Sequence, residues 1–161
     1  MIDISNTATT KRWDIRVSRA DLFKIVSLQT SYINNRLPVR DDLRVLSEDD
    51  TAIYNTYLLN AVADLNVMLA RYYQREFDEG EMDSDYIYLD LSLSLNAKDS
   101  IAFSLGKYIE QYLEKSILKE WYGADSYALG IDNLLAQYEA RIKTTLNYRK
   151  TPTRLNINPL F

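Results

Sequence analysis

Hydrophobic positions recur at helical spacing along most of the chain, and this periodicity predicts a mainly helical protein. Three helix starts are indicated, because Ser18, Ser47 and Asn96 are each followed three residues later by an aspartate, the spacing of a capping box. The chain holds only four glycines and three prolines, which favours long helices. The four predicted helices cover residues 18–37, 47–76, 96–121 and 127–146.

The apolar stripe of each predicted helix indicates which side chains form the core. The stripe of the first helix contains Leu22, Ile25, Val26 and Tyr32. That of the second contains Tyr54, Leu58, Val62, Leu65, Leu69 and Tyr72. The third helix contributes Ile101, Leu105, Tyr108, Ile109, Tyr112, Leu113, Ile117 and Trp121. The fourth contributes Tyr127, Ile131, Leu134, Leu135, Tyr138, Ile142 and Leu146.

Residues 86–95 alternate strictly between apolar and polar positions, which predicts a strand. The apolar side consists of Ile87, Leu89, Leu91, Leu93 and Leu95. The other side begins with Tyr86 and Tyr88. This strand has no hairpin partner beside it in sequence, although its backbone groups must be paired. Either the chain's own ends supply strands, from the alternating residues 13–17 and 155–157, or a neighbouring subunit supplies one by edge addition.

We therefore expect a mainly α fold with four main helices and a small β element made from the central strand and the chain ends. A length of 161 residues fits one domain, here residues 1–161. Within it we expect residues 1–17 to form an extended N-terminal arm. Residues 149–161 are expected to form a basic C-terminal tail.

The residue types needed for most catalytic and metal sites are missing from the sequence. Cysteine and histidine are both absent, which excludes a thiolate nucleophile, an imidazole base and a Cys/His zinc site. Asp83 and Asp85 have the spacing that begins a calcium loop, but the loop glycine is missing and the twelfth position is Ser94. We expect no enzymatic activity, no cofactor and no bound metal.

The sequence also indicates where the protein resides. The first residues lack the basic start and apolar run of a signal peptide. No stretch approaches the roughly 18 consecutive apolar residues that a membrane-spanning helix needs. We expect a protein made in a cytoplasm-like compartment and not embedded in a membrane.

Charge is distributed unevenly along the chain. From residue 141 onward there are five basic residues and no acidic one, so the net charge of −4 divides into −9 for residues 1–140 and +5 for the remainder. A basic end of this size gives weak, salt-dependent phosphate contacts, and no nucleic-acid recognition motif accompanies it. Pairing of the tail with an acidic protein surface is the alternative.

Three stretches resemble a family from tailed phages and prophages of Bacteroidetes hosts. They are "VSRADLFKIVSLQTSYI" (17–33), "AKDSIAFSLGKYIEQYLEKSILKEWYG" (97–123) and "YEARIKTTLNYRKTPTR" (138–154). The first is similar to the family's opening motif, the second to its central helix ending in a Trp, and the third to its closing basic motif. Proteins of this family lie among the head and neck genes and resemble helical head–tail connectors.

The resemblance implies a virion protein located at the head–tail interface and assembled in the bacterial host. Such a subunit docks under the portal protein as one of about a dozen copies in a ring. A tail or loop inserts into the neighbouring copy, other neck or tail proteins bind the ring, and packaged DNA passes through its lumen. The long leading segment and the central strand depart from better-known connectors, which leaves the ring layer open.

We expect the contacts between copies to come from the central strand and the tail. The predicted interface residues are Tyr86, Tyr88, Leu89, Leu91, Arg149, Lys150, Arg154, Leu160 and Phe161. Two other functions stay open at this point. One is a tail-completion or terminator protein, and the other is a small helical regulator that binds nucleic acid or a host protein.

Overall fold

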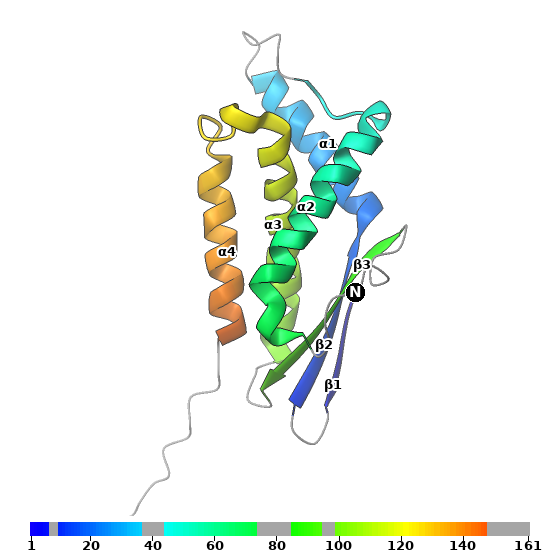
Figure 1. Cartoon of the computed structure of the whole chain (residues 1–161), viewed down its shortest axis with the longest axis vertical. Coiled ribbons are helices and arrows are strands. Elements are labelled where there is room, and N and C mark those ends of the chain that lie inside the picture. Colours follow the sequence, from blue (N-terminus) through cyan, green and yellow to red (C-terminus); the bar gives the residue numbers. More distant parts are fainter. Residues whose placement is uncertain (7–9, 37–43, 74–84, 95–98, 148–161) are drawn as a thin grey trace, which may run out of the picture.

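The computed structural model of the chain describes residues 1–6, 10–36, 44–73, 85–94 and 99–147. Over these residues the fold is mainly helical with a small antiparallel sheet, as the sequence predicts (Figure 1). The strands are β1 (Ile2–Asn6), β2 (Thr10–Ser18) and β3 (Tyr86–Ser94). The helices are α1 (Arg19–Arg36), α2 (Thr51–Leu69), α3 (Ala102–Tyr122) and α4 (Ile131–Asn147). Short 3-10 turns η1 (Glu48–Asp50), η2 (Ala70–Tyr72), η4 (Asp99–Ile101) and η5 (Gly123–Asp125) flank them.

The N-terminal end of the chain supplies the partner of the central strand. The strand order is β1-β2-β3, and both pairings are antiparallel, with Val17 opposite Ile87 and Trp13 opposite Leu91. β1 and β2 therefore form an antiparallel pair that lies on the body, which we call the N-terminal hairpin, whereas the sequence predicts an extended arm over residues 1–17. Of the two sources that the sequence leaves open for this pairing, the chain itself provides the strand. Residues 155–157 lie outside the described part of the chain.

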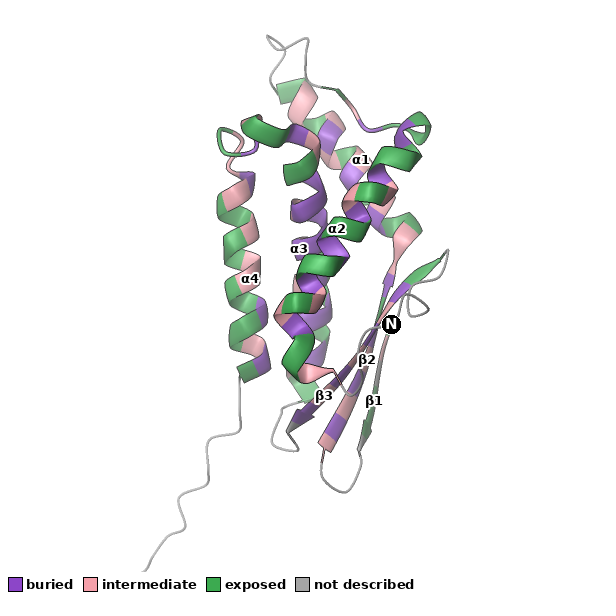
Figure 2. Cartoon of the chain, viewed as in Figure 1, coloured by how far each residue is buried: buried purple, intermediate pink, exposed green. Residues whose placement is uncertain are grey.

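The sheet is apolar on one face and polar on the other. Trp13 and Ile15 of β2 are buried, as are the alternate residues of β3 that face the same way. On the opposite face the Arg12 Nε donates hydrogen bonds to Asp14 and Asp90 at 3.1 and 2.9 Å. This alternation places the apolar face against the helices, where Figure 2 shows the buried residues of the strands and of α3.

α3 is the central helix of the fold. It contacts α1, α2, α4 and the first two strands, and eleven of its residues are buried. β1 approaches it most closely at Gly106, where a Cβ atom would lie 2.8 Å from the Ile2 side chain. The absence of a side chain at this position therefore lets the hairpin lie directly on the helix.

Two helices differ from the sequence prediction at their stripes. α4 begins at Ile131, because residues 127–130 form a turn in which the Gly130 N–H donates to the Tyr127 carbonyl and Gly130 has a φ of +72°. Tyr127 is consequently 77% exposed and does not belong to the core stripe. In α1, Ile25 and Tyr32 are also exposed, because the helix buries the adjacent stripe that contains Leu22 and Val26.

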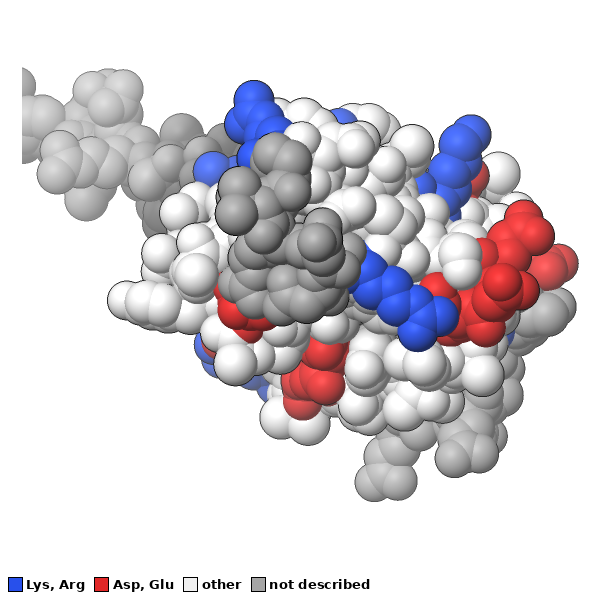
Figure 3. Space-filling view, turned by 90° about the horizontal axis from the view of Figure 1, so that it is seen from above, with Lys and Arg blue, Asp and Glu red and all other residues white. Residues whose placement is uncertain are grey.

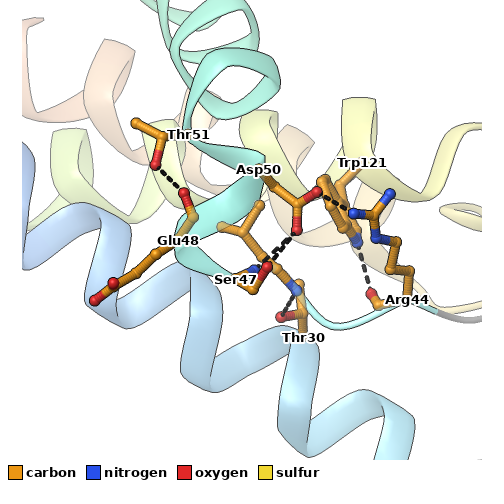
Figure 4. A network of polar contacts seen from close by, with 8 residues as sticks. Thr30, Arg44, Ser47, Glu48, Asp50, Thr51 and Trp121 are labelled. Atoms are coloured by element: carbon orange, nitrogen blue, oxygen red, sulfur yellow. Dashed lines mark hydrogen bonds and ion pairs between the residues drawn. The ribbon is translucent and has the colours of Figure 1, made fainter.

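A polar network fixes the segment between α1 and α2 onto α3 (Figure 4). The Thr30 hydroxyl accepts a hydrogen bond from the Leu46 N–H at 3.0 Å, and the Ser27 hydroxyl donates to the Leu46 carbonyl at 2.8 Å. From α3, the Trp121 indole N–H donates to the Arg44 carbonyl at 2.9 Å. Buried backbone groups of a connecting segment thus obtain partners from two helices.

Asp50 is the charged centre of this network. Its side chain is only 2% exposed. The carboxylate accepts hydrogen bonds from the backbone N–H and the hydroxyl of Ser47, at 3.0 and 2.9 Å, and it forms an ion pair with Arg44. The hydrogen bond from the Ser47 backbone is the largest of the influences that hold the pKa of Asp50 below its ordinary value. The serine–aspartate pair predicted as a helix start is therefore present, with Asp50 as a structural carboxylate.

We predict that Asp50→Asn destabilises the fold at neutral pH. A group with a lowered folded-state pKa contributes stability above its ordinary pKa of 3.8, and this contribution is lost as the pH falls through the lower, folded value. Urea unfolding of the wild-type protein and of Asp50→Asn between about pH 3 and pH 7 should show that the difference in their free energies of unfolding becomes smaller toward pH 3. Asp49→Asn, at an exposed neighbouring position, is the matched control. A difference independent of pH would contradict a stabilising charge on Asp50.

Candidate assembly surfaces

The outer face of α2 is an exposed stripe without charge, which we call the α2 stripe. It consists of Ala52, Thr56, Leu59, Ala63, Val67 and Ala70, and all of these residues are exposed. Val67 is 80% exposed and Leu59 is 53% exposed. At 1.5 Å per residue the stripe is about 27 Å long. Figure 2 shows exposed residues recurring along the visible face of α2.

The opposite side of α2 is also apolar. Tyr54, Leu58, Val62, Leu65 and Leu69 are buried there, as the sequence predicts. Asp64 is the only charged residue of the helix. A surface helix of a globular protein normally has charged residues on the face opposite its core stripe. A helix with a single charged residue and apolar residues on both sides is typical of a position between two apolar surfaces.

A second apolar surface surrounds a cavity of about 420 Å³ between the N-terminal hairpin and α3. Met1, Ile4 and Phe103 line it and are 77%, 41% and 76% exposed. The charged residues of the lining are Arg16, Asp99, Lys107 and Glu110. We call this the hairpin surface, and it lies on β1, β2 and the first turns of α3.

The exposed side of α1 also carries apolar residues. Ile25, Leu28 and Tyr32 lie on the same side of α1 as Asp21, because they follow it at helical spacing, and they are 39%, 61% and 52% exposed. Burial raises the pKa of Glu110, which lines the cavity, while the positive charges of the N-terminus and Lys107 act in the opposite direction.

A third concave feature is a polar groove of about 580 Å³ between α2 and α4. Tyr112 of α3 lies in its lining, together with Val67 and Met68 of α2. At one end, Asn147 accepts hydrogen bonds from Arg71 and from the Tyr72 hydroxyl, both at 3.1 Å. These contacts hold the end of α4 against the end of α2.

The structure divides the predicted interface residues of the central strand into two groups. Tyr86 is 42% exposed, and Tyr88 is half-buried with the Arg16 guanidinium 5.8 Å from its ring centroid. Leu89 and Leu91 are only 1% and 0% exposed. The prediction that these two leucines contact another copy is therefore wrong, because the alternation that suggested an edge also turns them into the core.

The remaining predicted interface residues belong to the tail and lie outside the described residues: Arg149, Lys150, Arg154, Leu160 and Phe161. The last described helix, α4, ends far from η1 along the long axis of the molecule (Figure 1). Glu48 and Asp49 of η1 are exposed. Figure 3 looks down on the end of the molecule that contains η1 and shows acidic side chains gathered on one side of that end.

The α2 stripe was missed by sequence reasoning, although a signal was present. Residues 51–69 contain a single charged residue, whereas the other three helices contain several each. Counting apolar positions identifies the core side of such a helix, but only the missing charges on the remaining positions indicate a second buried side. The hairpin surface had no comparable signal, because β1 is short and was not predicted.

The described residues hold no cluster of three or more metal-ligating side chains. In the same part of the chain, no helix combines the length and apolar character needed to cross a membrane. Comparisons with protein-family models, curated proteins and solved structures find no significant match to this chain.

We predict that Leu89→Ala lowers the free energy of unfolding by about 2–5 kcal/mol, because it leaves a cavity in the core. Tyr88→Ser, on the other face of the same strand, should cost less than about 1 kcal/mol, the scale of one exposed cation–π or cross-strand contact. Urea unfolding of the two variants provides the measurement. Equal losses would contradict the assignment of the two faces.

Proposed function

We propose that this protein is a non-catalytic structural subunit that assembles with copies of itself into a neck ring between the portal and the tail of a tailed phage. The ring passes packaged DNA and binds the portal protein on one side and further neck or tail proteins on the other. The location in the virion and these partners rest on the family resemblance of residues 17–33, 97–123 and 138–154.

The observation that carries the proposal is the uncharged α2 stripe. Large exposed apolar patches on a soluble chain mark surfaces that bind other proteins. Val67, Leu59 and Ala63 lie on one straight helix face, and the small side chains between the larger ones allow another surface to approach closely. A ring subunit needs such a face to be covered in every copy.

The uneven distribution of charge along the chain supports electrostatic contacts between layers of the assembly. Residues 141–161 carry +5, while the exposed Glu48 and Asp49 lie at the opposite end from the end of α4. Opposite charges on the basic tail and on Glu48 and Asp49 favour contacts between neighbouring molecules, and they steer association. Such contacts are salt-dependent, in contrast to those of the α2 stripe.

We predict that Val67→Lys abolishes self-association without unfolding the protein. A charge buried at the centre of an interface should cost at least about 2 kcal/mol, or roughly a thirtyfold weaker association constant. Native mass spectrometry of the protein mixed with the portal ring of its own virus measures the number of copies added. Wild type should add one copy per portal subunit.

Gln137→Lys is the matched control, because it places the same charge on an exposed position of α4. It should assemble like wild type. Equal assembly of Val67→Lys and wild type would remove the α2 stripe from the interface. A failure of wild type to bind the portal, with fewer copies bound to a tail tube, would favour the terminator function. Tight, steeply salt-dependent binding to duplex DNA would favour the regulator.

A second variant tests the tail. Arg149→Glu combined with Lys150→Glu should weaken assembly while leaving the circular dichroism signal of the helices unchanged, because it removes two positive charges from the tail and adds two negative ones. The same mass-spectrometric titration, repeated at low and high salt, measures the effect. Rings that form normally at both salt concentrations would show that tail charge does not contribute.

A further inference from the structure

The outer edge of β1 is open. The strand order β1-β2-β3 places β1 at the margin of the sheet, and no described strand lies beside it. Met1 and Arg16 form a hydrogen-bonded pair, because the Arg16 N–H donates to the Met1 carbonyl and the Met1 amine to the Arg16 carbonyl, at 2.9 and 3.1 Å. Such pairs alternate along an antiparallel ladder, so Ile2 and Ile4 direct their backbone N–H and C=O groups away from β2. Within the described part of the chain no hydrogen bond satisfies these outward groups.

The cavity of the hairpin surface lies beside this edge. Ile2 and Ile4 are on the apolar face of the sheet, opposite Ile15 and Trp13, and they line the cavity together with Phe103 of α3. A fourth strand beside β1 would direct alternate side chains onto the same face, over Phe103, which is 76% exposed. The charged residues of the lining are of both signs, so apolar contact decides what fits there. Edge and cavity together suit an extended segment with alternating apolar side chains.

A segment of this kind follows α4 in the sequence. In residues 153–158, which lie outside the described residues, Leu155 and Ile157 alternate with polar side chains. Pro152 and Pro159 stand on either side of this segment. Proline is confined to the ends and edges of strands because it has no N–H to donate, so the two prolines bound a stretch that can pair. Its six residues match the five of β1 in length.

We infer that residues 153–158 of one copy add to β1 of the next copy as a fourth strand, with Leu155 and Ile157 over the cavity. This inference rests on the proposed self-assembly and assigns the tail its contact. α4 packs on α3, and Figure 1 shows it on the side of α3 away from the N-terminal hairpin, which favours the β1 edge of a neighbour. Residues 148–152 span at most about 20 Å when extended, so the contact is limited to adjacent copies.

The polar face of the sheet favours a basic residue in the added strand. The register aligns three aspartates in one row across the sheet: Asp3, Asp14 and Asp90. Arg12 pairs with two of them, and Arg16 lies further along β2 over the Tyr88 ring, so the row itself has more negative than positive charge. Arg154 alternates with the apolar residues of the tail segment and would lie on this face. Opposite charges on neighbouring strands stabilise their pairing.

Cross-linking tests this inference directly, since the chain contains no cysteine. Ser5→Cys, at an exposed position of β1, and Asn156→Cys, in the tail, are prepared with an affinity tag on one of them. They are treated with a short bis-maleimide, alone and mixed, free and bound to the portal ring. The mixture should give a covalent dimer of one tagged and one untagged chain. Its yield should exceed that with Gln137→Cys, on the exposed face of α4, in place of Asn156→Cys by at least about tenfold.

A second comparison tests which tail side chains face the cavity. Ile157→Ser, added to Asn156→Cys, should lower the yield of the mixed dimer about tenfold, because it removes an apolar side chain from the contact. Asn158→Ser is the matched control and should leave the yield unchanged, because Asn158 alternates with Ile157 and faces away from the cavity. Equal yields from the two variants would contradict the pairing of this segment as a strand.

The double variant Ser5→Cys with Asn156→Cys separates a contact between copies from one within a copy. It should give a ladder of higher oligomers. An internal link without oligomers would show that the tail pairs with its own sheet, which overturns the inference and leaves assembly through the α2 stripe intact. Portal-bound protein without any linkage between positions 5 and 156 would overturn it and leave the neck function intact. Protein that neither associates nor binds the portal would overturn both.

Discussion

The burial of α3 is the constraint on which the rest of the structure depends. Its apolar residues are distributed around most of its circumference, so one neighbour cannot cover them, and α1, α2, α4 and the N-terminal hairpin each cover part. Gly106 lets the hairpin lie against the helix, and the Thr30–Trp121 network fixes the segment that leads into α2. A helix that needs four neighbours brings together elements that are far apart in the sequence.

The same arrangement leaves two apolar surfaces uncovered. α2 covers α3 with one stripe and carries a second, uncharged stripe on its outside, while Phe103 emerges on the far side of α3 where no described element covers it. In a protein that acts alone, charged residues at these positions would cost little and would increase solubility. A subunit between two neighbours has a physical reason to keep both surfaces apolar. In the proposed ring a neighbouring copy covers the α2 stripe.

The sequence predicted the parts of the fold that depend on local periodicity. The four helices and β3 follow from apolar spacing, and the buried stripe of α2 is correct. It did not predict β1 or the hairpin, because the five residues of β1 are too few for alternation to be recognised. Leu89 and Leu91 were assigned to an interface for a related reason: alternation shows that a strand has two faces, but not which face the helices cover. The α2 stripe depends on missing charges, which a search for apolar positions overlooks.

An electron cryomicroscopy reconstruction of the protein assembled on its portal ring tests the central claim most directly, because it shows what covers α2. The account predicts a ring in which Val67 and Leu59 of each copy are buried against a neighbouring copy. A ring in which the α2 stripe faces solvent or the DNA channel, while other surfaces join the copies, would contradict it.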